Sequence, residues 1–262
     1  MVMAKDSKVD LNFYHKNGYI IIRGLLDPAE VQAIQDFKKQ IDREVVDADG
    51  DFQKNGAHFN FERKDINAQS FSNASAVRCG VLRKIQEVYF LDEIFRKVCT
   101  SKKVLDVVEE IIGPTIYYHS SKLMYKGAGG RKKPWHQDFA YWKSLNSKQV
   151  TVWYAIDKAT KENGCIQVLP GSHKRGLVPH FGDEAQFNPE DHFKANEIIF
   201  AEMSPGDVLF FDVLTFHASD ANLSKNDRLS AILNFQSALG EKEYNRCKEP
   251  LRAPALSAGA FN

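Results

Sequence analysis

The chain has 262 residues, enough for one domain with a sizeable core, and its 43% hydrophobic and 26% charged residues are typical of a globular protein. Thirty-five lysines and arginines against 34 acidic residues give a formal net charge of +1, which argues against nucleic acid or an anionic membrane as a partner. The four cysteines are scattered without metal-site spacing, so we expect reduced thiols. No apolar run has the length of a signal peptide or a membrane span, so we expect a cytoplasmic protein.

Residues 1–113 are expected to form a mainly helical layer. Asp27 followed by Pro28 is a helix start signal, because Asp caps the helix and Pro suits its first position. Apolar residues then recur at spacings of three and four, which predicts one buried face. A second helix is expected over residues 101–112, where a Gly-Pro pair ends the apolar pattern.

A polar, aperiodic stretch over residues 47–75 separates these helices and predicts a long loop. Phe52, Phe59 and Phe61 are embedded in it. One interpretation is a lid that closes over bound substrate with these rings inward, which would protect a reactive intermediate from water. The other is a surface loop that its phenylalanines pin to the helical layer.

From residue 114 the pattern changes to short segments rich in β-branched and aromatic residues, separated by Gly, Pro and Asn turn signals. Since no helix of convincing length interrupts them, an antiparallel jelly roll is favoured over βαβ units. We expect this core over residues 114–240, a C-terminal tail over 241–262, and a single domain over residues 1–262. The expected strands are residues 115–126, 149–157, 166–169, 197–201, 208–213 and 228–239.

The sharpest local motif is His136-Gln137-Asp138. In an extended segment alternate side chains point the same way, so His136 and Asp138 would face one point while Gln137 turns aside. These are two of the three ligands of a 2-His-1-carboxylate facial triad, which holds Fe(II) and leaves positions open. Alone the motif is weak, because His-x-Asp often arises by chance.

A second histidine and an arginine follow. An apolar strand over residues 210–217 leads to His217, 81 residues after His136 (217 − 136), although such a histidine is more often a hydrogen-bonded core residue. Arg228 comes eleven residues later (228 − 217), in an apolar strand where it shares a face with Ser230. A buried arginine needs an anionic partner, and no acid lies on its face of that strand. A bound dicarboxylate would supply one through paired hydrogen bonds.

Four colinear stretches together resemble the phytanoyl-CoA dioxygenase family of 2-oxoglutarate oxygenases. They are residues 13–26, His136-Gln-Asp, the segment Glu-Asn-Gly-Cys-Ile-Gln-Val-Leu-Pro-Gly-Ser-His over residues 162–173, and residues 206–228. The resemblance spans nearly the whole chain, and the combination is specific even though each piece is not. It implies a mainly β protein, a double-stranded β-helix of the cupin type, here with an N-terminal helical layer.

The resemblance also implies the cofactors and their ligands. Fe(II) would be held by His136, Asp138 and His217, and 2-oxoglutarate would chelate the metal while Arg228 and Ser230 anchor its distal carboxylate. With O2 as the second co-substrate, the enzyme would hydroxylate or otherwise oxidise an unactivated carbon and release succinate and CO2. The iron carries the chemistry, while the protein supplies position and a dry cavity.

Five neighbouring residues have two interpretations each. By the resemblance, Lys122 and Trp153 touch the co-substrate, but a solvated strand lysine and a plain core tryptophan fit the sequence equally well. Phe139, Tyr141 and Trp142 follow the metal motif and are expected to wall the substrate pocket, although aromatic residues there are often only packing.

Two further features stay outside the metal motif. His173 follows a Pro-Gly turn, which favours a structural hydrogen bond over metal ligation, and His119, His180 and His192 have no partner pattern. The Arg-Lys-Lys run at residues 131–133 is either a solvated loop or a contact for a substrate phosphate or carboxylate, as in an acyl-CoA.

Three kinds of protein remain in competition. The first is the hydroxylase, or a desaturase, acting on a small-molecule metabolite, with an acyl-CoA as the less favoured substrate. The second is a halogenase, but those enzymes carry Gly or Ala where Asp138 stands. The third is a non-catalytic jelly-roll binding module or a metal-dependent isomerase, and neither needs Arg228. A monomer and a homodimer both remain open.

Overall fold

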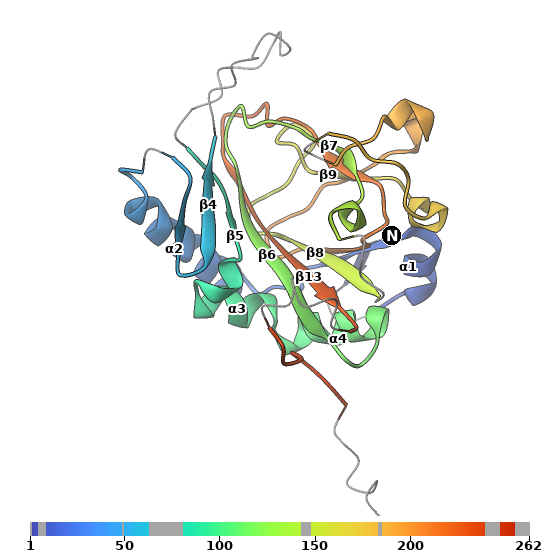
Figure 1. Cartoon of the computed structure of the whole chain (residues 1–262), viewed down its shortest axis with the longest axis horizontal. Helices are drawn as coiled ribbons and strands as arrows, with labels where there is room; N and C mark the ends of the chain where they lie inside the picture. Colours follow the sequence, from blue (N-terminus) through green and yellow to red (C-terminus); the bar gives the residue numbers. More distant parts are fainter. Residues whose placement is uncertain are drawn as a thin grey trace, which may run out of the picture.

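The protein is described by a computed structural model covering residues 2–4, 9–48, 50–62, 81–142, 148–182, 185–238 and 247–254. Most of this chain forms a double-stranded β-helix of two sheets, antiparallel except where the first two strands pair (Figure 1). The larger sheet contains, in spatial order, β1 (Val2–Ala4), β2 (Tyr19–Arg23), β11 (Val208–Asp212), β8 (Gln149–Ala155), β13 (Arg228–Gln236), β6 (Tyr117–Lys126), β5 (Leu82–Gln86), β4 (Ala57–Phe61) and β3 (Phe52–Lys54). The smaller sheet contains β10 (Ile199–Ala201), β9 (Ile166–Val168), β12 (His217–Ser219) and β7 (Lys133–His136).

All six strands expected from the sequence beyond residue 114 are present, each slightly shorter than predicted. Their alternation gives the larger sheet two different faces. On β6, Leu123 is fully buried in the main apolar core, whereas Lys122 and Met124 line a cavity on the opposite face. Every residue of β8 is buried, because this central strand is covered on both sides.

Helices cover the face of the larger sheet that lies away from the cavity (Figure 1). The predicted start of the long helix is confirmed, because the Glu30 carboxylate accepts a hydrogen bond from the backbone N–H of Asp27 at 2.7 Å. Ile34 and Val108, from two of these helices, are fully buried in the same core as Leu123. The helices are α1 (Leu11–Asn17), α2 (Pro28–Glu44), α3 (Glu93–Cys99) and α4 (Lys102–Ile112). Among the described residues, no helix is long and apolar enough to cross a membrane.

The expectation of a mainly helical first third is only partly right, because five strands of the larger sheet, β1 to β5, also lie there. The predicted long loop is wrong where it is described. Its residues 52–61 form the β3–β4 hairpin, which extends the sheet beyond β5. Phe59 and Phe61 are buried in the main core and Phe52 stacks on Phe59 with ring centroids 4.5 Å apart, so these rings do not face substrate. Residues 63–80 lie outside the described chain.

A close approach of three segments fixes the N-terminal end of the fold. Gly18 caps α1 with a left-handed φ of +80°, and its backbone meets the side chains of His173 and Thr215. A Cβ at this position would lie 2.4 Å from His173 Nδ1 and 2.6 Å from Thr215 Oγ1. His173 Nε2 lies 3.1 Å from the carbonyl oxygen of His15, which is the structural role that the sequence favoured.

Candidate active site

Three buried side chains form a cluster that can hold a metal ion: His136, Asp138 and His217. Their ligand atoms lie within 4.8 Å of one another. His136 ends β7 and His217 begins β12, and the two residues are opposite partners in the antiparallel register of these strands. The Nε2 atom of each histidine is 3.7 Å from Asp138 Oδ1. The donor set of two imidazoles and one carboxylate is that of a facial triad.

The local backbone explains how His136 and Asp138 meet. Gln137 between them is extended, and Asp138 opens a short 3-10 helix. Gln137 turns to the other side, where its amide nitrogen donates to the carbonyl oxygens of Gly176 at 2.9 Å and Leu214 at 2.7 Å. The alternation expected from the sequence therefore holds, although β7 itself ends at His136.

The predicted single strand over residues 210–217 is wrong. β11 ends at Asp212, whose carboxylate accepts a hydrogen bond from the backbone N–H of Leu214 at 2.8 Å. This side-chain turn sends the chain into the other sheet, where His217 is the first residue of β12 rather than the last of β11. The change of sheet is what brings His217 opposite His136.

Both histidines are held with Nε2 toward the cluster. The Nδ1 atom of His136 lies 2.8 Å from the carbonyl oxygen of Pro134, and that of His217 lies 3.0 Å from the carbonyl oxygen of Thr215. A carbonyl accepts only from a protonated Nδ1, so each Nε2 keeps its lone pair. Burial lowers the pKa of both side chains, which favours the neutral form that a metal ion requires.

Arg228 lies on the same cavity and is nearly inaccessible to solvent, with 3% exposure. Its guanidinium lies over the ring of Trp153 at 5.3 Å and donates through Nη1 to the carbonyl oxygen of Gly164. Arg228 Nε and the hydroxyl of Ser230 are buried without a hydrogen-bond partner. Burial lowers the pKa of Arg228 to about 10, so the group stays charged at neutral pH. These two unsatisfied donors fit a carboxylate of a bound ligand.

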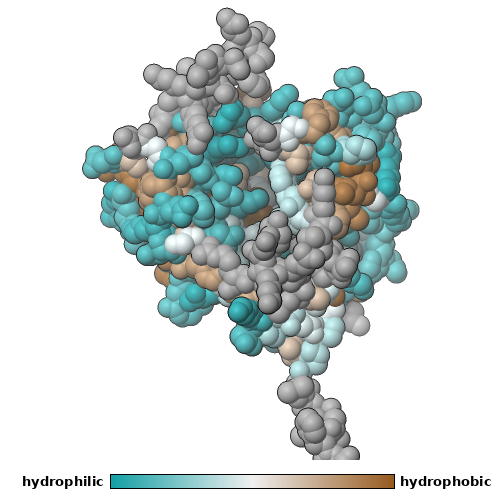
Figure 2. Space-filling model, in the orientation of Figure 1, coloured by the Kyte–Doolittle hydropathy of each residue, from teal (hydrophilic) through white to brown (hydrophobic). Residues whose placement is uncertain are grey.

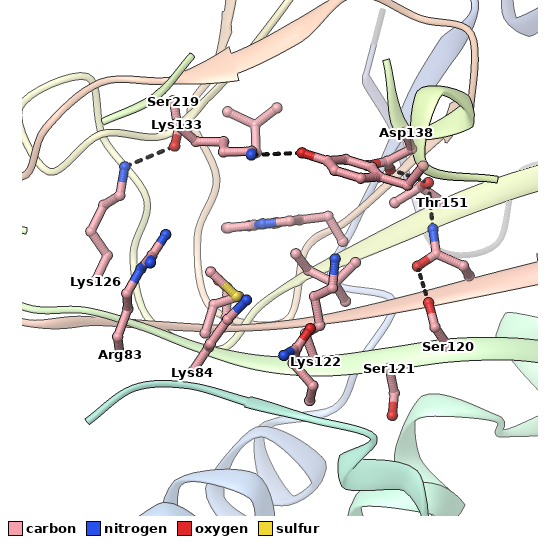
Figure 3. Close-up of a pocket in the computed structure, with 18 of the residues that line it drawn as sticks. Arg83, Lys84, Ser120, Ser121, Lys122, Lys126, Lys133, Asp138, Thr151 and Ser219 are labelled. Atoms are coloured by element: carbon pink, nitrogen blue, oxygen red, sulfur yellow. Dashed lines mark hydrogen bonds between the residues drawn. The ribbon is translucent and has the colours of Figure 1, made fainter. Parts of the chain in front are cut away.

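A cavity of about 710 Å³ connects the triad with Arg228. Figure 2 shows this face of the molecule hollowed near its centre, with hydrophilic side chains along much of the rim. In the wall that the larger sheet forms, Ile232 on β13 lies opposite Lys122 on β6 and Trp153 on β8. Two rows from these residues along β13, Arg228 lies opposite Lys126. Figure 3 shows Lys122 reaching into the cavity.

The aromatic residues after the metal motif divide into two groups. Tyr141 and Trp142 line the cavity, and their predicted contact with substrate stays a prediction. Phe139 does not line the cavity and instead packs with Trp142 against Val213. The structure therefore favours the second interpretation of Phe139, in which the ring only packs. The difference arises because the 3-10 turn after Gln137 rotates Phe139 away from the cavity.

The sequence analysis did not single out several polar residues of this cavity. His119, left unassigned, is 5% exposed, packs against Trp142 at 4.4 Å between ring centroids, and has no hydrogen bond at either ring nitrogen. Thr151 and Asn234 line the same cavity, and each interrupts its strand between two fully buried apolar residues. That interruption is the signal that could have identified them, because a buried polar side chain needs a partner.

The fold and the triad together define the class of iron- and 2-oxoglutarate-dependent dioxygenases, and the chain is a member of it. The sequence profile described as phytanoyl-CoA dioxygenase (PhyH) matches residues 14–230, and the chain belongs to this family. It is 29% identical over 238 residues to the peroxisomal phytanoyl-CoA dioxygenase of Bos taurus, which covers 86% of this chain and 67% of that enzyme.

Two further comparisons agree with this assignment. The ectoine dioxygenase of Streptomyces anulatus is 24% identical over 267 residues, covering 94% of this chain and 81% of that enzyme. The crystal structure of EctD from S. alaskensis with bound Fe superposes with a TM-score of 0.67 at 22% identity, covering 95% of this chain and 88% of that one. This structural likeness supports the fold.

Proposed function

We propose that His136, Asp138 and His217 hold Fe(II), that Arg228 and Ser230 bind the distal carboxylate of 2-oxoglutarate, and that the protein oxidises an unactivated carbon of a small anionic metabolite. The observation that carries this proposal is that the triad and the unsatisfied donors of Arg228 and Ser230 line one cavity. A binding module without catalysis has no need of both.

The roles of the chain's own residues follow from their places in the cavity. Bound iron with 2-oxoglutarate supplies the oxidising power, with succinate and CO2 as co-products. Arg228, fixed by Trp153 and Gly164, orients the co-substrate through its free Nε and one edge of the guanidinium. Lys122, two rows closer to Asp138 than Arg228 is, lies where it can meet a carboxylate of the co-substrate or of the substrate.

The charge of the cavity wall indicates the substrate class. Eight lining residues are Lys or Arg and three are Asp or Glu, an excess of five positive charges (8 − 3) in a chain whose whole net charge is +1. The charges of Fe(II) and of 2-oxoglutarate cancel, so loading the site leaves this excess in place. The cations are Arg83, Lys84, Lys122, Lys126, Arg131, Lys132, Lys133 and Arg228, and the acids are Glu62, Glu87 and Asp138.

Part of this excess lies on half-buried side chains that line the cavity. Arg83 and Arg131 lie 4.0 and 3.4 Å from the Glu62 carboxylate, and their side chains are 26% and 28% exposed. Lys133 donates to the hydroxyl of Tyr141 at 2.7 Å, and both residues line the cavity. The Arg-Lys-Lys run thus fits the interpretation of a contact for substrate phosphate or carboxylate better than that of a solvated loop.

Anaerobic metal binding and succinate release test the reaction assignment. With Fe(II), 2-oxoglutarate and an accepted substrate, the unmodified chain should form succinate and an oxidised product in equal amounts. Asp138→Ala should lose both metal affinity and succinate formation, because one leg of a three-ligand site is gone. Full activity of Asp138→Ala would remove the triad from the mechanism.

The substrate class is tested by a screen of charge-matched pairs, in which each phosphorylated or carboxylated metabolite is offered beside its neutral analogue. We expect the anionic member to turn over with the lower KM, and this preference to shrink in Lys132→Gln/Lys133→Gln. The matched control is Lys39→Gln/Lys97→Gln, which removes two cations from exposed helix faces. Equal turnover of neutral and anionic members would contradict the anionic class while leaving the reaction type intact.

An acyl-CoA is the second candidate substrate. The likeness to phytanoyl-CoA dioxygenase favours it, and the phosphates of coenzyme A also suit a basic cavity. A panel of branched and straight acyl-CoA thioesters beside the free acids separates the two. Turnover restricted to thioesters assigns 2-hydroxylation of an acyl-CoA, and turnover of the free anions alone assigns a small metabolite.

A further inference from the structure

A row of three polar side chains runs across the cavity wall to the carboxylate of Asp138. Ser120 on β6, Asn234 on β13 and Thr151 on β8 are direct opposites in the registers of these three neighbouring strands. Ser120 Oγ donates to Asn234 Oδ1 at 2.8 Å, and Asn234 Nδ2 donates to Thr151 Oγ1 at 2.7 Å. Thr151 Oγ1 donates to Asp138 Oδ2 at 2.6 Å. Figure 3 labels Ser120, Thr151 and Asp138 and marks the hydrogen bonds of this row with dashed lines.

The row is buried where polar groups are costly. Thr151 is 1% and Asn234 2% exposed, and their chain neighbours on both strands are fully buried apolar residues. A hydroxyl or an amide in such a place is tolerated only with its hydrogen bonds made. Each member here is satisfied by the next, and every donor points toward Asp138, so the bonds polarise one another in one direction.

The two oxygens of Asp138 therefore have different surroundings. Oδ1 faces the Nε2 atoms of His136 and His217, each at 3.7 Å, while Oδ2 is taken by the Thr151 hydroxyl. A carboxylate held in this way offers a metal ion one oxygen. If both oxygens bound, the carboxylate would occupy a position that the facial triad leaves open for co-substrate and oxygen.

We propose that Thr151, held by Asn234 and Ser120, positions Asp138 as a one-oxygen ligand and so keeps the other coordination positions of the metal free. This inference rests on the proposed metal site. Thr151 and Asn234 are positioning residues that act through Asp138, in the same way as the backbone carbonyls that fix His136 and His217. All three ligands are then held from behind by a hydrogen bond.

The test compares Thr151→Val, which keeps the shape of the side chain without its hydroxyl, with Thr151→Ser, which keeps the hydroxyl. Co(II) binding is measured anaerobically by calorimetry, and the Co(II) absorption spectrum reports the coordination number without any turnover. We expect Thr151→Val to bind Co(II) roughly 10- to 100-fold more weakly, as outer-shell partners of metal ligands typically do, and to change the spectrum. Thr151→Ser should resemble the unmodified chain in both.

Two adjacent serines provide a matched pair that does not depend on the folding of Thr151→Val. Ser120 belongs to the row, whereas Ser121 faces the other side of β6, where its hydroxyl accepts from the backbone N–H of Tyr89 at 2.9 Å and lies 2.9 Å from the Tyr118 hydroxyl. Ser120→Ala should weaken Co(II) binding more than Ser121→Ala, although Ser121→Ala loses more buried hydrogen bonds and should unfold more easily.

The outcomes separate this inference from the proposed function. Equal Co(II) affinity and spectrum in the unmodified chain and folded Thr151→Val would overturn it, as would equal Co(II) affinity in Ser120→Ala and Ser121→Ala. If the unmodified chain does not bind Co(II), or binds it equally well after Asp138→Ala, the proposed metal site itself fails, and this inference with it.

Discussion

The guanidinium of Arg228 lies over the indole ring of Trp153, 5.3 Å from its centroid. Because the guanidinium lies against this ring and its Nη1 donates to the carbonyl oxygen of Gly164, the plane of the guanidinium is fixed, and its Nε remains without a hydrogen-bond partner. A charged fork held in one orientation is suited to a planar carboxylate and to few other ligands.

Arg228→Ala should weaken 2-oxoglutarate binding roughly a hundredfold, since hydrogen bonds to a charged group contribute about 1.5–3 kcal/mol each. Co(II) affinity should stay within a few-fold, because the metal cluster does not contact Arg228. Arg228→Lys should recover only part of the loss, since a point charge does not reproduce the fork. Calorimetric titration of the Co(II)-loaded variants with 2-oxoglutarate measures this. Unchanged affinity in Arg228→Ala would assign the arginine to structure.

Phe59→Ala should destabilise the fold without touching the co-substrate site. Phe59 is 1% exposed in the main core and stacks on Phe52, so its loss leaves a large cavity beneath the β3–β4 hairpin. We expect the free energy of unfolding to fall by about 3–5 kcal/mol. Denaturant unfolding measures it, with the affinity for 2-oxoglutarate as the control that should not change. A loss of affinity without loss of stability would instead support the lid interpretation.

The β3–β4 hairpin could not be predicted from the sequence, whereas most of the later strands could. Ala57, Phe59 and Phe61 alternate with polar residues, as a half-buried strand requires, but the pattern is only five residues long and lies within a polar region. The partner strand, β5, comes after a further twenty residues (82 − 61 − 1), and such distant pairing leaves no local signal. Six of the strands after residue 114 were predictable because turn signals separate them, whereas the short strands β7 and β12 were not predicted as separate elements.

In the candidate site, too, some residues could be predicted from the sequence and others could not. His136, Asp138, His217 and Arg228 were predictable because their spacing along the chain matches a family pattern. The Thr151 row was not, since it depends on the relative register of three strands. The break after Asp212 was also hidden, because the turn that follows is apolar and only the Asp212 side chain, bonded to Leu214, marks it.

Gly18→Ala should disturb the triad from a distance. An alanine at φ +80° is strained by about 1–2 kcal/mol, and its Cβ would displace Thr215, whose carbonyl oxygen holds His217 Nδ1. We expect lower stability together with weaker Co(II) binding. Gly24→Ala is the matched control, since Gly24 also has a positive φ of +60° but nothing lies within 4 Å of its Cβ position. Gly24→Ala should lower the free energy of unfolding but leave the affinity for Co(II) unchanged. Equal metal affinity in both variants would argue against the link through Thr215.

The metal-free chain should lose stability in mildly acidic solution because of His119. Burial, together with the nearby Lys122 charge, lowers the pKa of His119 to about 4, whereas in the unfolded chain it is about 6.5. Between these values the unfolded state binds more protons, so this contribution to the free energy of unfolding is complete above about pH 6.5 and is lost as the pH falls toward 4. The pKa values of His136 and His217 are lowered as well, and these two residues add to the loss of stability at low pH.

The variant His119→Phe keeps an aromatic ring against Trp142 and removes only the contribution of His119 to this pH dependence. The free energy of unfolding of His119→Phe should therefore fall less steeply with decreasing pH than that of the unmodified chain. Denaturant unfolding of both proteins at pH 7.5, 6.5, 5.5 and 4.5 gives the two slopes. If the slopes coincide, His119 keeps its proton in the folded state, and its unpartnered place in the cavity must be revised.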